Sequence, residues 1–163
     1  MTFEIERKFL VPSDEWRPLA TGQTHIRQAY LACDAKASIR VRIRREKDAT
    51  LTIKSREPRV RRLELEYPIP ILDAQALIQL CQGAHIEKIR YNVPLGAHTW
   101  EIDVFLGENS GLVIAEIELK HEREGVELPS WIGTEVTGQW RYYNVSLAQH
   151  PFCSWRKAPN SKG

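Results

Sequence analysis

The sequence has few cysteines, no long apolar run and little excess of either charge. Its three cysteines, Cys33, Cys81 and Cys153, are widely spaced and none forms a CxxC pair, so neither a disulfide framework nor a zinc site is expected. Reduced thiols predict a cytoplasmic protein. No stretch approaches the roughly 18 apolar residues of a membrane-spanning helix, and a charged run begins at residue 4, so neither secretion nor membrane spanning is expected.

Several catalytic motifs are also absent, and the charge balance excludes one class of partner. There is no glycine-rich phosphate loop ending in Lys-Ser or Lys-Thr, no GxSxG and no HExxH, and the five histidines never fall at metal-ligand spacing. The net charge is +2, from 23 basic and 21 acidic residues, whereas a nucleic-acid-binding domain is usually much more basic. The 163 residues fit one domain that spans 1–163.

Charged and apolar side chains alternate in seven short runs along the chain. The first run places Glu4, Glu6 and Lys8 on one face of a strand, because side chains two residues apart share a face. The last run repeats this spacing with two carboxylates and a lysine. The seven runs are residues 4–10, 38–44, 50–54, 62–67, 88–91, 101–105 and 116–120. Half-apolar strands of this kind predict a largely antiparallel sheet, although alternation does not say which face points inward.

The charges on these runs are sorted by sign. One run carries Arg40, Arg42 and Arg44 on a single face, whereas others carry mainly carboxylates. Same-face neighbours lie about 7 Å apart, so three arginines in a row repel one another unless an anion binds them. A polyphosphate with its metal ions would engage both sets, because Arg and Lys complement phosphate oxygens while carboxylates complement the metals. The first run taken alone also fits a solvated edge strand.

These motifs, taken in order, resemble the CYTH or triphosphate tunnel metalloenzyme superfamily, and specifically its short bacterial members. Residues 4–8, Glu-Ile-Glu-Arg-Lys, match the ExExK motif of that family. The resemblance extends over residues 3–152. It continues through residues 28–31, 40–42, 52–54, 64–69, 86–91, 100–105, 115–119 and 135–138.

The resemblance implies a mainly β (α+β) fold, an eight-stranded antiparallel β-barrel whose polar faces line a tunnel, with a few flanking helices outside. It also implies that one or two Mg2+ or Mn2+ ions assist in hydrolysing or transforming a triphosphate compound, a small-molecule substrate. Gln139 and Trp140 depart from the pattern, because relatives often carry more polar residues there. The oligomeric state does not follow from the sequence.

The predicted reaction is metal-dependent hydrolysis of inorganic triphosphate to pyrophosphate and phosphate, by in-line attack of water on a terminal phosphorus. The resemblance implies Lys88, assisted by Tyr30, as the activator of water; the alternative is that Lys88 only binds phosphate and Tyr30 only packs. The residues assigned to the triphosphate oxygens are Lys8, Arg40, Arg42, Lys54, Arg90 and Lys88. The pool of metal ligands, direct or through water, is Glu4, Glu6, Glu64, Glu66, Asp103, Glu116 and Glu118.

Three other functions fit the same pattern. A class IV adenylate cyclase would direct a ribose hydroxyl at the α-phosphorus, and a thiamine or nucleoside triphosphatase would accept a bulky organic group. Both need a pocket for that organic group, which the sequence does not reveal. The third is a non-catalytic polyphosphate-binding module.

Three helical segments are expected on the outside of the barrel. One is capped by Asp73, runs over residues 74–82 and ends at Gly83; the others cover residues 14–19 and a stretch after Asn144 that ends before residue 151. A further basic cluster lies around Pro58. It comprises Arg56, Arg59, Arg61 and Arg62, and it predicts a solvated hairpin connection, with an anion attractor at the tunnel mouth as the alternative.

Overall fold

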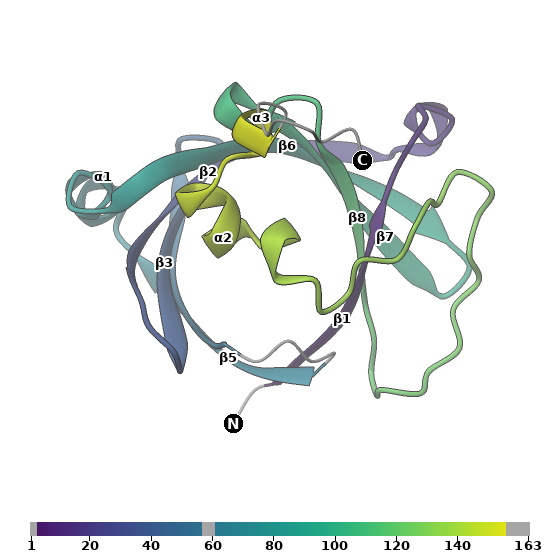
Figure 1. Cartoon of the computed structure of the whole chain (residues 1–163), viewed down its shortest axis with the longest axis horizontal. Helices are drawn as coiled ribbons and strands as arrows, with labels where there is room; N and C mark the ends of the chain where they lie inside the picture. Colours follow the sequence, from purple (N-terminus) through teal and green to yellow (C-terminus); the bar gives the residue numbers. More distant parts are fainter. Residues whose placement is uncertain (1–2, 57–60, 156–163) are drawn as a thin grey trace.

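The computed structural model describes residues 3–56 and 61–155, in which eight strands close into an antiparallel barrel (Figure 1). Around the barrel the order is β1, β5, β4, β3, β2, β6, β7 and β8, and β8 returns to β1. The strands are β1 (Phe3–Leu10), β2 (Gly22–Cys33), β3 (Ala37–Arg44), β4 (Asp48–Ser55), β5 (Arg61–Ile69), β6 (Gln82–Leu95), β7 (His98–Leu106) and β8 (Val113–Glu118). The mainly β, eight-stranded antiparallel barrel is therefore confirmed.

Alternation along the strands turns the charged faces inward and most apolar faces outward. On the outer face of β3 and β4, Val41, Ile43 and Ala49 are buried under Ala74 and Ile78 of helix α1 (Ile71–Ile78). A second outer cluster, built around Phe9, Trp16, Trp100, Ile117 and Trp131, lies under the segments that flank β1 and follow β8. The apolar surface that an antiparallel sheet must bury is thus covered from outside, which leaves the interior to polar groups.

Helix α1 differs from its predicted position. It begins at Ile71 after Pro70, and Asp73 lies in its first turn without making a capping hydrogen bond. It ends at Ile78, and Gln82 already belongs to β6. Gly83 does not end the helix; it has a positive φ of 77° and faces the carbonyl oxygen of Ala148, which a Cβ would meet at 2.8 Å. The glycine is therefore required by close packing as well as by its positive φ.

The remaining helices are short. The stretch 14–19 contains only the 3-10 helix η1 (Arg17–Leu19); two further 3-10 helices are η2 (Gly107–Asn109) and η3 (Trp140–Tyr142). Helix α2 (Asn144–Gln149) begins at Asn144 itself rather than after it and ends before residue 151, as predicted, and α3 (Phe152–Trp155) was not predicted. Within residues 3–56 and 61–155, no helix combines the length and the apolar character needed to cross a membrane.

Helix α2 does not lie on the outside of the barrel, so that part of the prediction is wrong. Viewed along the barrel, η3 and α2 lie inside the ring of strands (Figure 1). Four successive residues, Val145 to Ala148, are buried, which is typical of a helix surrounded by protein rather than amphipathic on a surface. Three of them, Val145, Leu147 and Ala148, pack in one cluster with Tyr30, Ile86, Phe105 and Ile114.

The inward faces of three strands change from charged to apolar side chains where α2 lies. On β6 the inward side chain changes from Lys88 to Ile86, and on β7 from Asp103 to Phe105. On β8 it changes from Glu116 to Ile114. One end of the barrel is therefore apolar inside and filled by α2, while the middle is charged.

Candidate active site

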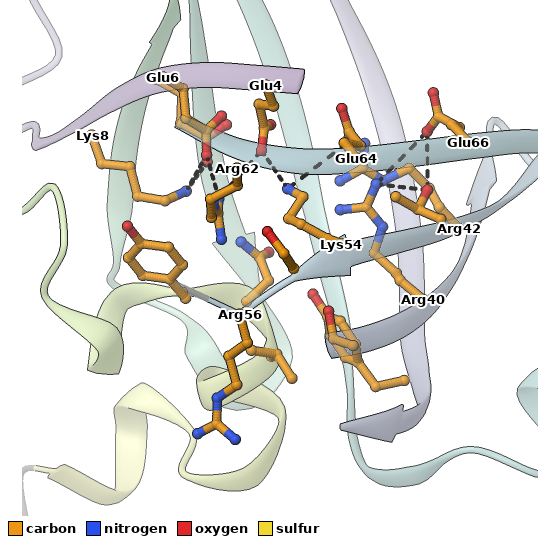
Figure 2. Close-up of a pocket in the computed structure, with 18 of the residues that line it drawn as sticks. Glu4, Glu6, Lys8, Arg40, Arg42, Lys54, Arg56, Arg62, Glu64 and Glu66 are labelled. Carbon is orange, nitrogen blue, oxygen red and sulfur yellow. Dashed lines mark hydrogen bonds and ion pairs between the residues drawn. The ribbon is translucent and has the colours of Figure 1, made fainter. Parts of the chain in front are cut away.

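The charged middle of the barrel encloses a cavity of about 190 Å³, and charged side chains of β1, β3, β4 and β5 gather around it (Figure 2). Strands β6, β7 and β8 also line it with charged groups. Its basic lining consists of Lys8, Arg40, Arg42, Arg44, Lys54, Arg56, Arg62, Lys88 and Arg90. Its acidic lining consists of Glu4, Glu6, Glu64, Glu66, Glu101, Glu116 and Glu118. Strand β2 contributes Tyr30, and the C-terminal segment contributes Trp140, Tyr143, Asn144 and Val145. Every predicted site residue except Asp103 lines this cavity.

Strand β3 forms a basic wall on which Arg42 has no anionic partner. Arg42 is buried, and its Nε donates to Gln28 Oε1 at 2.6 Å; among the described residues no carboxylate lies within ion-pair distance of it. Burial, followed by the charges of Arg40, Arg90 and Arg44, lowers the pKa of Arg42 to about 9. An anion placed here would relieve that unfavourable charge.

Arg40, the neighbour of Arg42 on this wall, is only partly satisfied. Its NH2 group donates to Thr52 Oγ1 at 3.2 Å and lies 3.8 Å from Glu66 Oε2. Its buried Nε has no hydrogen-bond partner within residues 3–56 and 61–155. Buried donors are nearly always paired, so an unpaired guanidinium N–H beside a cavity indicates a missing acceptor.

Ion pairs join the inward side chains of β1 to Arg62 of β5. The sequence analysis did not place Arg62 in the site. Arg62 is buried and donates to Glu6 Oε1 at 3.0 Å and Glu4 Oε1 at 3.3 Å (Figure 2). Lys54 Nζ lies 2.9 Å from Glu4 Oε1. The assignment of Arg62 to a solvated hairpin is therefore wrong. The usable signal was its period-two spacing with Glu64, which places both on one face of β5.

The rest of that basic cluster is divided. Arg61 is exposed, with its Cζ 4.0 Å from the centre of the Phe3 ring, as expected for a hairpin. Arg56 instead lines the cavity, and its Cζ lies 4.4 Å from the centre of the Trp140 ring. Arg59 lies outside the described residues.

Several carboxylates are crowded enough to resist ionisation. Burial and the charge of Glu116 raise the pKa of Glu6, and burial, Glu4 and Glu101 raise the pKa of Glu118. Burial opposes the ionisation of Glu4 and Glu116 as well, but neighbouring cations lower their pKa values, and Glu116 pairs with Lys8. The carboxylate face therefore has more negative charge than its own cations neutralise.

This donor set suits a hard divalent cation, which prefers carboxylate oxygens. As the side chains are arranged, no three Asp, Glu, His or Cys groups within residues 3–56 and 61–155 lie close enough together to hold an ion. The fit is in the chemistry and the charge of the donors, because several of them are held by Lys8, Lys54 and Arg62 instead.

Lys88 lies at the junction of the charged cavity and the apolar end. Its Nζ donates to Asp103 Oδ2 at 2.7 Å and to Asn144 Oδ1 at 3.0 Å. Complete burial, with the charges of Arg90 and Arg42, lowers the pKa of Lys88 to about 7, although Asp103 opposes this shift. A lysine with that pKa can exchange protons near neutral pH.

Asp103 occupies a different position from the one predicted. It is fully buried outside the cavity lining, and Arg90 donates to its Oδ1 at 2.7 Å and to its Oδ2 at 2.8 Å. Lys88 Nζ also donates a hydrogen bond to Oδ2 of Asp103. With both oxygens occupied by cations, this arrangement favours a role in holding Lys88 and Arg90 over the predicted role as a metal ligand.

Tyr30 and Trp140 line the end of the cavity that α2 closes. Tyr30 packs in the apolar cluster, and burial raises the pKa of its hydroxyl, so the phenol stays protonated. Trp140 stacks on Tyr143 with ring centres 5.1 Å apart. The sequence pattern departed from the family at Trp140, and the structure places that residue in the cavity wall.

Comparison with known proteins agrees with this architecture. The CYTH domain family matches residues 2–152, nearly the whole chain. The chain belongs to the CYTH family. The inorganic triphosphatase of Acetivibrio thermocellus is 44% identical over 155 residues, which cover 94% of this chain and 98% of that protein. The inorganic triphosphatase of Nitrosomonas europaea is 36% identical over 152 residues, covering 89% of this chain and 96% of that protein. A crystal structure of an inorganic triphosphatase matches with a TM-score of 0.62 and 34% identity, over 89% of this chain and 97% of that chain.

Proposed function

We propose that this CYTH protein hydrolyses inorganic triphosphate to pyrophosphate and phosphate, with in-line attack of water on a terminal phosphorus. The observation that carries this proposal is Arg42, a buried guanidinium that has no anionic partner among the described residues and is flanked by Arg40 and Arg90 in a cavity open to solvent. A linear polyanion would satisfy both Arg42 and Arg40. The two relatives reported above are named inorganic triphosphatases.

The carboxylate face gives this hydrolase its proposed metal dependence. We assign Mg2+ or Mn2+, one or two ions, to the predicted carboxylates that line the cavity, directly or through water. These are Glu4, Glu6, Glu64, Glu66, Glu116 and Glu118. A bound divalent cation neutralises charge on the phosphate oxygens.

The protein side chains supply positioning, charge and a proton acceptor. Arg40, Arg42, Arg90, Lys8 and Lys54 hold the phosphate oxygens, and phosphoryl transfer depends largely on such positioning and charge neutralisation. For the proton acceptor we propose Lys88 on β6, whose pKa of about 7 lets it take a proton from the attacking water.

Two further residues assist that lysine. Tyr30 keeps its proton because burial raises its pKa, so it acts as a hydrogen-bond donor at the closed end of the cavity. Asp103 holds Lys88 and Arg90 in fixed positions. The cytoplasmic location, the single domain and the absence of nucleic-acid and membrane partners stay predictions.

One assay separates this function from its alternatives. Tripolyphosphate, ATP and thiamine triphosphate are each supplied with Mg2+ or Mn2+, and phosphate, pyrophosphate and cyclic AMP are measured separately. We expect the highest kcat/KM with tripolyphosphate and equal amounts of phosphate and pyrophosphate. Cyclic AMP from ATP, or preferred cleavage of an organic triphosphate, would contradict the proposal, and binding without turnover would indicate a polyphosphate-binding module.

A further inference from the structure

Asn144, the first residue of α2, connects the C-terminal segment to the charged groups of the barrel. Its side chain lines the cavity, and its Oδ1 accepts hydrogen bonds from Lys88 Nζ and from Gln28 Nε2, both at 3.0 Å. The sequence pattern marked this residue only as the point after which a helix begins. Its position makes it a candidate for contact with the substrate.

The orientation of the Asn144 amide follows from its neighbours. Gln28 is fully buried, and its Oε1 accepts from Arg42 Nε at 2.6 Å; because arginine only donates, Gln28 must present its NH2 group to Asn144. Lys88 also donates to the same oxygen of Asn144. The cations at the two ends of this chain, Arg42 and Lys88, therefore fix which way both amides point.

This orientation leaves the NH2 group of Asn144 without a protein acceptor among the described residues. An amide NH2 group complements a phosphate oxygen. We propose that Asn144 is a further substrate-binding residue, whose NH2 group donates to a phosphoryl oxygen while its Oδ1 holds Lys88 beside that phosphoryl group. The inference rests on the proposed function, because it takes a triphosphate as the occupant of the cavity.

Two variants test the contact with substrate. Asn144→Asp keeps the shape of the side chain but replaces the donor with a charged acceptor, whereas Asn144→Ala removes the side chain. We expect Asn144→Ala to weaken tripolyphosphate binding about tenfold, the effect of losing one hydrogen bond to a charged group, and Asn144→Asp to weaken it more. The control is Ser146→Ala, a buried position on the same helix that does not line the cavity.

Binding is measured by isothermal titration of tripolyphosphate in EDTA, and folding by the Tm of each variant. A packing role alone would make the isosteric Asn144→Asp milder than Asn144→Ala, so that order of affinities would overturn the inference. A wild-type protein that binds tripolyphosphate but cleaves none, with the expected order among the variants, would refute the proposed function and leave the contact standing.

The positioning of Lys88 needs a second measurement. In the wild-type background we expect Asn144→Ala to lower kcat about tenfold with Mg2+ present, in addition to raising KM. In a Lys88→Ala background the effect on kcat should disappear while the effect on KM remains, because only the phosphate contact is then left to lose. An unchanged effect on kcat in that background would refute the positioning role.

Discussion

Lys88 and Arg42 are cations that folding buries where their charged forms are unfavourable. This makes both side chains candidates for the chemistry of the site. Burial lowers the pKa of Lys88 to about 7 and that of Arg42 to about 9, so each charged form costs stability, and a bound anion would offset that cost. A lysine can release its proton at such a pKa, whereas an arginine beside it keeps its charge over the working pH range. The two residues therefore suit different tasks.

The pH dependence of turnover tests the task of Lys88. If Lys88 must be deprotonated to accept a proton from water, kcat should rise with pH and level off, with its midpoint above the pKa of about 7 in the ligand-free protein, because a bound triphosphate favours the protonated lysine. Lys88→Arg should lose both the rate and this rising limb, because arginine keeps the charge but does not deprotonate. The profile is measured at saturating substrate and saturating Mg2+, so that protonation of metal ligands does not contribute.

The opposite result is equally clear. If Lys88 only binds phosphate, Lys88→Arg would keep near-normal kcat and the same rising limb, and Lys88→Ala would mainly raise KM. That outcome would remove Lys88 as the base.

Substitution of Arg42 tests the basic wall. Arg42→Ala should weaken the binding of tripolyphosphate by about 2 kcal/mol, because a charge-assisted contact is lost in a partly dry cavity, and Arg42→Lys should restore only part of it. The free energy of unfolding should stay equal or rise, since a buried charge without a carboxylate partner is removed. Titration calorimetry and urea unfolding measure the two effects. Unchanged affinity together with unchanged kcat in Arg42→Ala would exclude it from the site.

At the scale of elements, period-two alternation predicts strands well wherever the two faces differ in charge. Six of the seven runs lie wholly in strands, and the seventh, residues 116–120, continues past the end of β8 at Glu118. Within the strands, the inward residues are the predicted ones. Strand β2 gave no such run, because its outward face is itself polar: Arg27 pairs with Glu46 and His25 with Glu87, while Gln28 points inward. Only the family resemblance supplied the eighth strand.

Helix α2 shows what local patterns cannot determine. Its bounds follow from the residues around Asn144, but its position inside the barrel depends on the inward side chains Ile86, Phe105 and Ile114, which lie on three separate strands. The pairing of Asp103 with Lys88 and Arg90 could not be predicted for a similar reason, because a carboxylate that binds cations and one that binds metal have the same spacing in sequence.

The close contact between Gly83 and α2 gives a prediction at this scale. Gly83→Ala should be destabilising because the residue has a φ of 77° and its Cβ would meet Ala148 O at 2.8 Å. Gly96→Ala is the matched control, with a φ of 62° and nothing within 4 Å. We expect about 1 kcal/mol of destabilisation from φ in both and a further loss in Gly83→Ala, measured by urea unfolding.

Activity separates the two glycine variants further. Displacing α2 in Gly83→Ala should also move Asn144 and so lower kcat, whereas Gly96→Ala should keep wild-type kcat. Equal destabilisation in the two variants would show that α2 can shift away from a Cβ at position 83 without loss of stability, so that its position does not depend on this contact.

For the whole molecule, the barrel balances one face of cations against one face of carboxylates across a shared cavity. The balance is incomplete without ligands. In the part of the chain that the structure describes, Arg42 has no anionic partner, while Glu6 and Glu118 have raised pKa values because burial and like charges oppose their ionisation. A raised carboxylate pKa means that the folded protein binds more protons than the unfolded chain above pH 4.5. Its contribution to stability therefore falls as pH rises from the unfolded pKa through the raised one.

Divalent cations should reverse that loss, and two carboxylates on β1 should respond in opposite ways. Burial and Glu116 raise the pKa of Glu6, so Glu6→Gln should raise the metal-free Tm at pH 8 and reduce the increase that Mg2+ or Mn2+ produces. Lys54 and Arg62 outweigh burial and lower the pKa of Glu4, so Glu4→Gln should lower the metal-free Tm by leaving those cations unpaired. Both variants should lose turnover.

Thermal unfolding of both variants at pH 5 and pH 8, with EDTA or with Mg2+, measures these shifts. Glu108→Gln, an exposed carboxylate on η2 away from the cavity, is the control and should behave as the wild type. In the wild type the Mg2+-induced increase in Tm should be larger at pH 8, because protons compete with the ion for the carboxylates at pH 5. A metal-free Tm that falls equally in Glu4→Gln and Glu6→Gln would mean that both carboxylates serve mainly to pair with barrel cations, and the metal site would then have to be built from Glu64, Glu66 and Glu118.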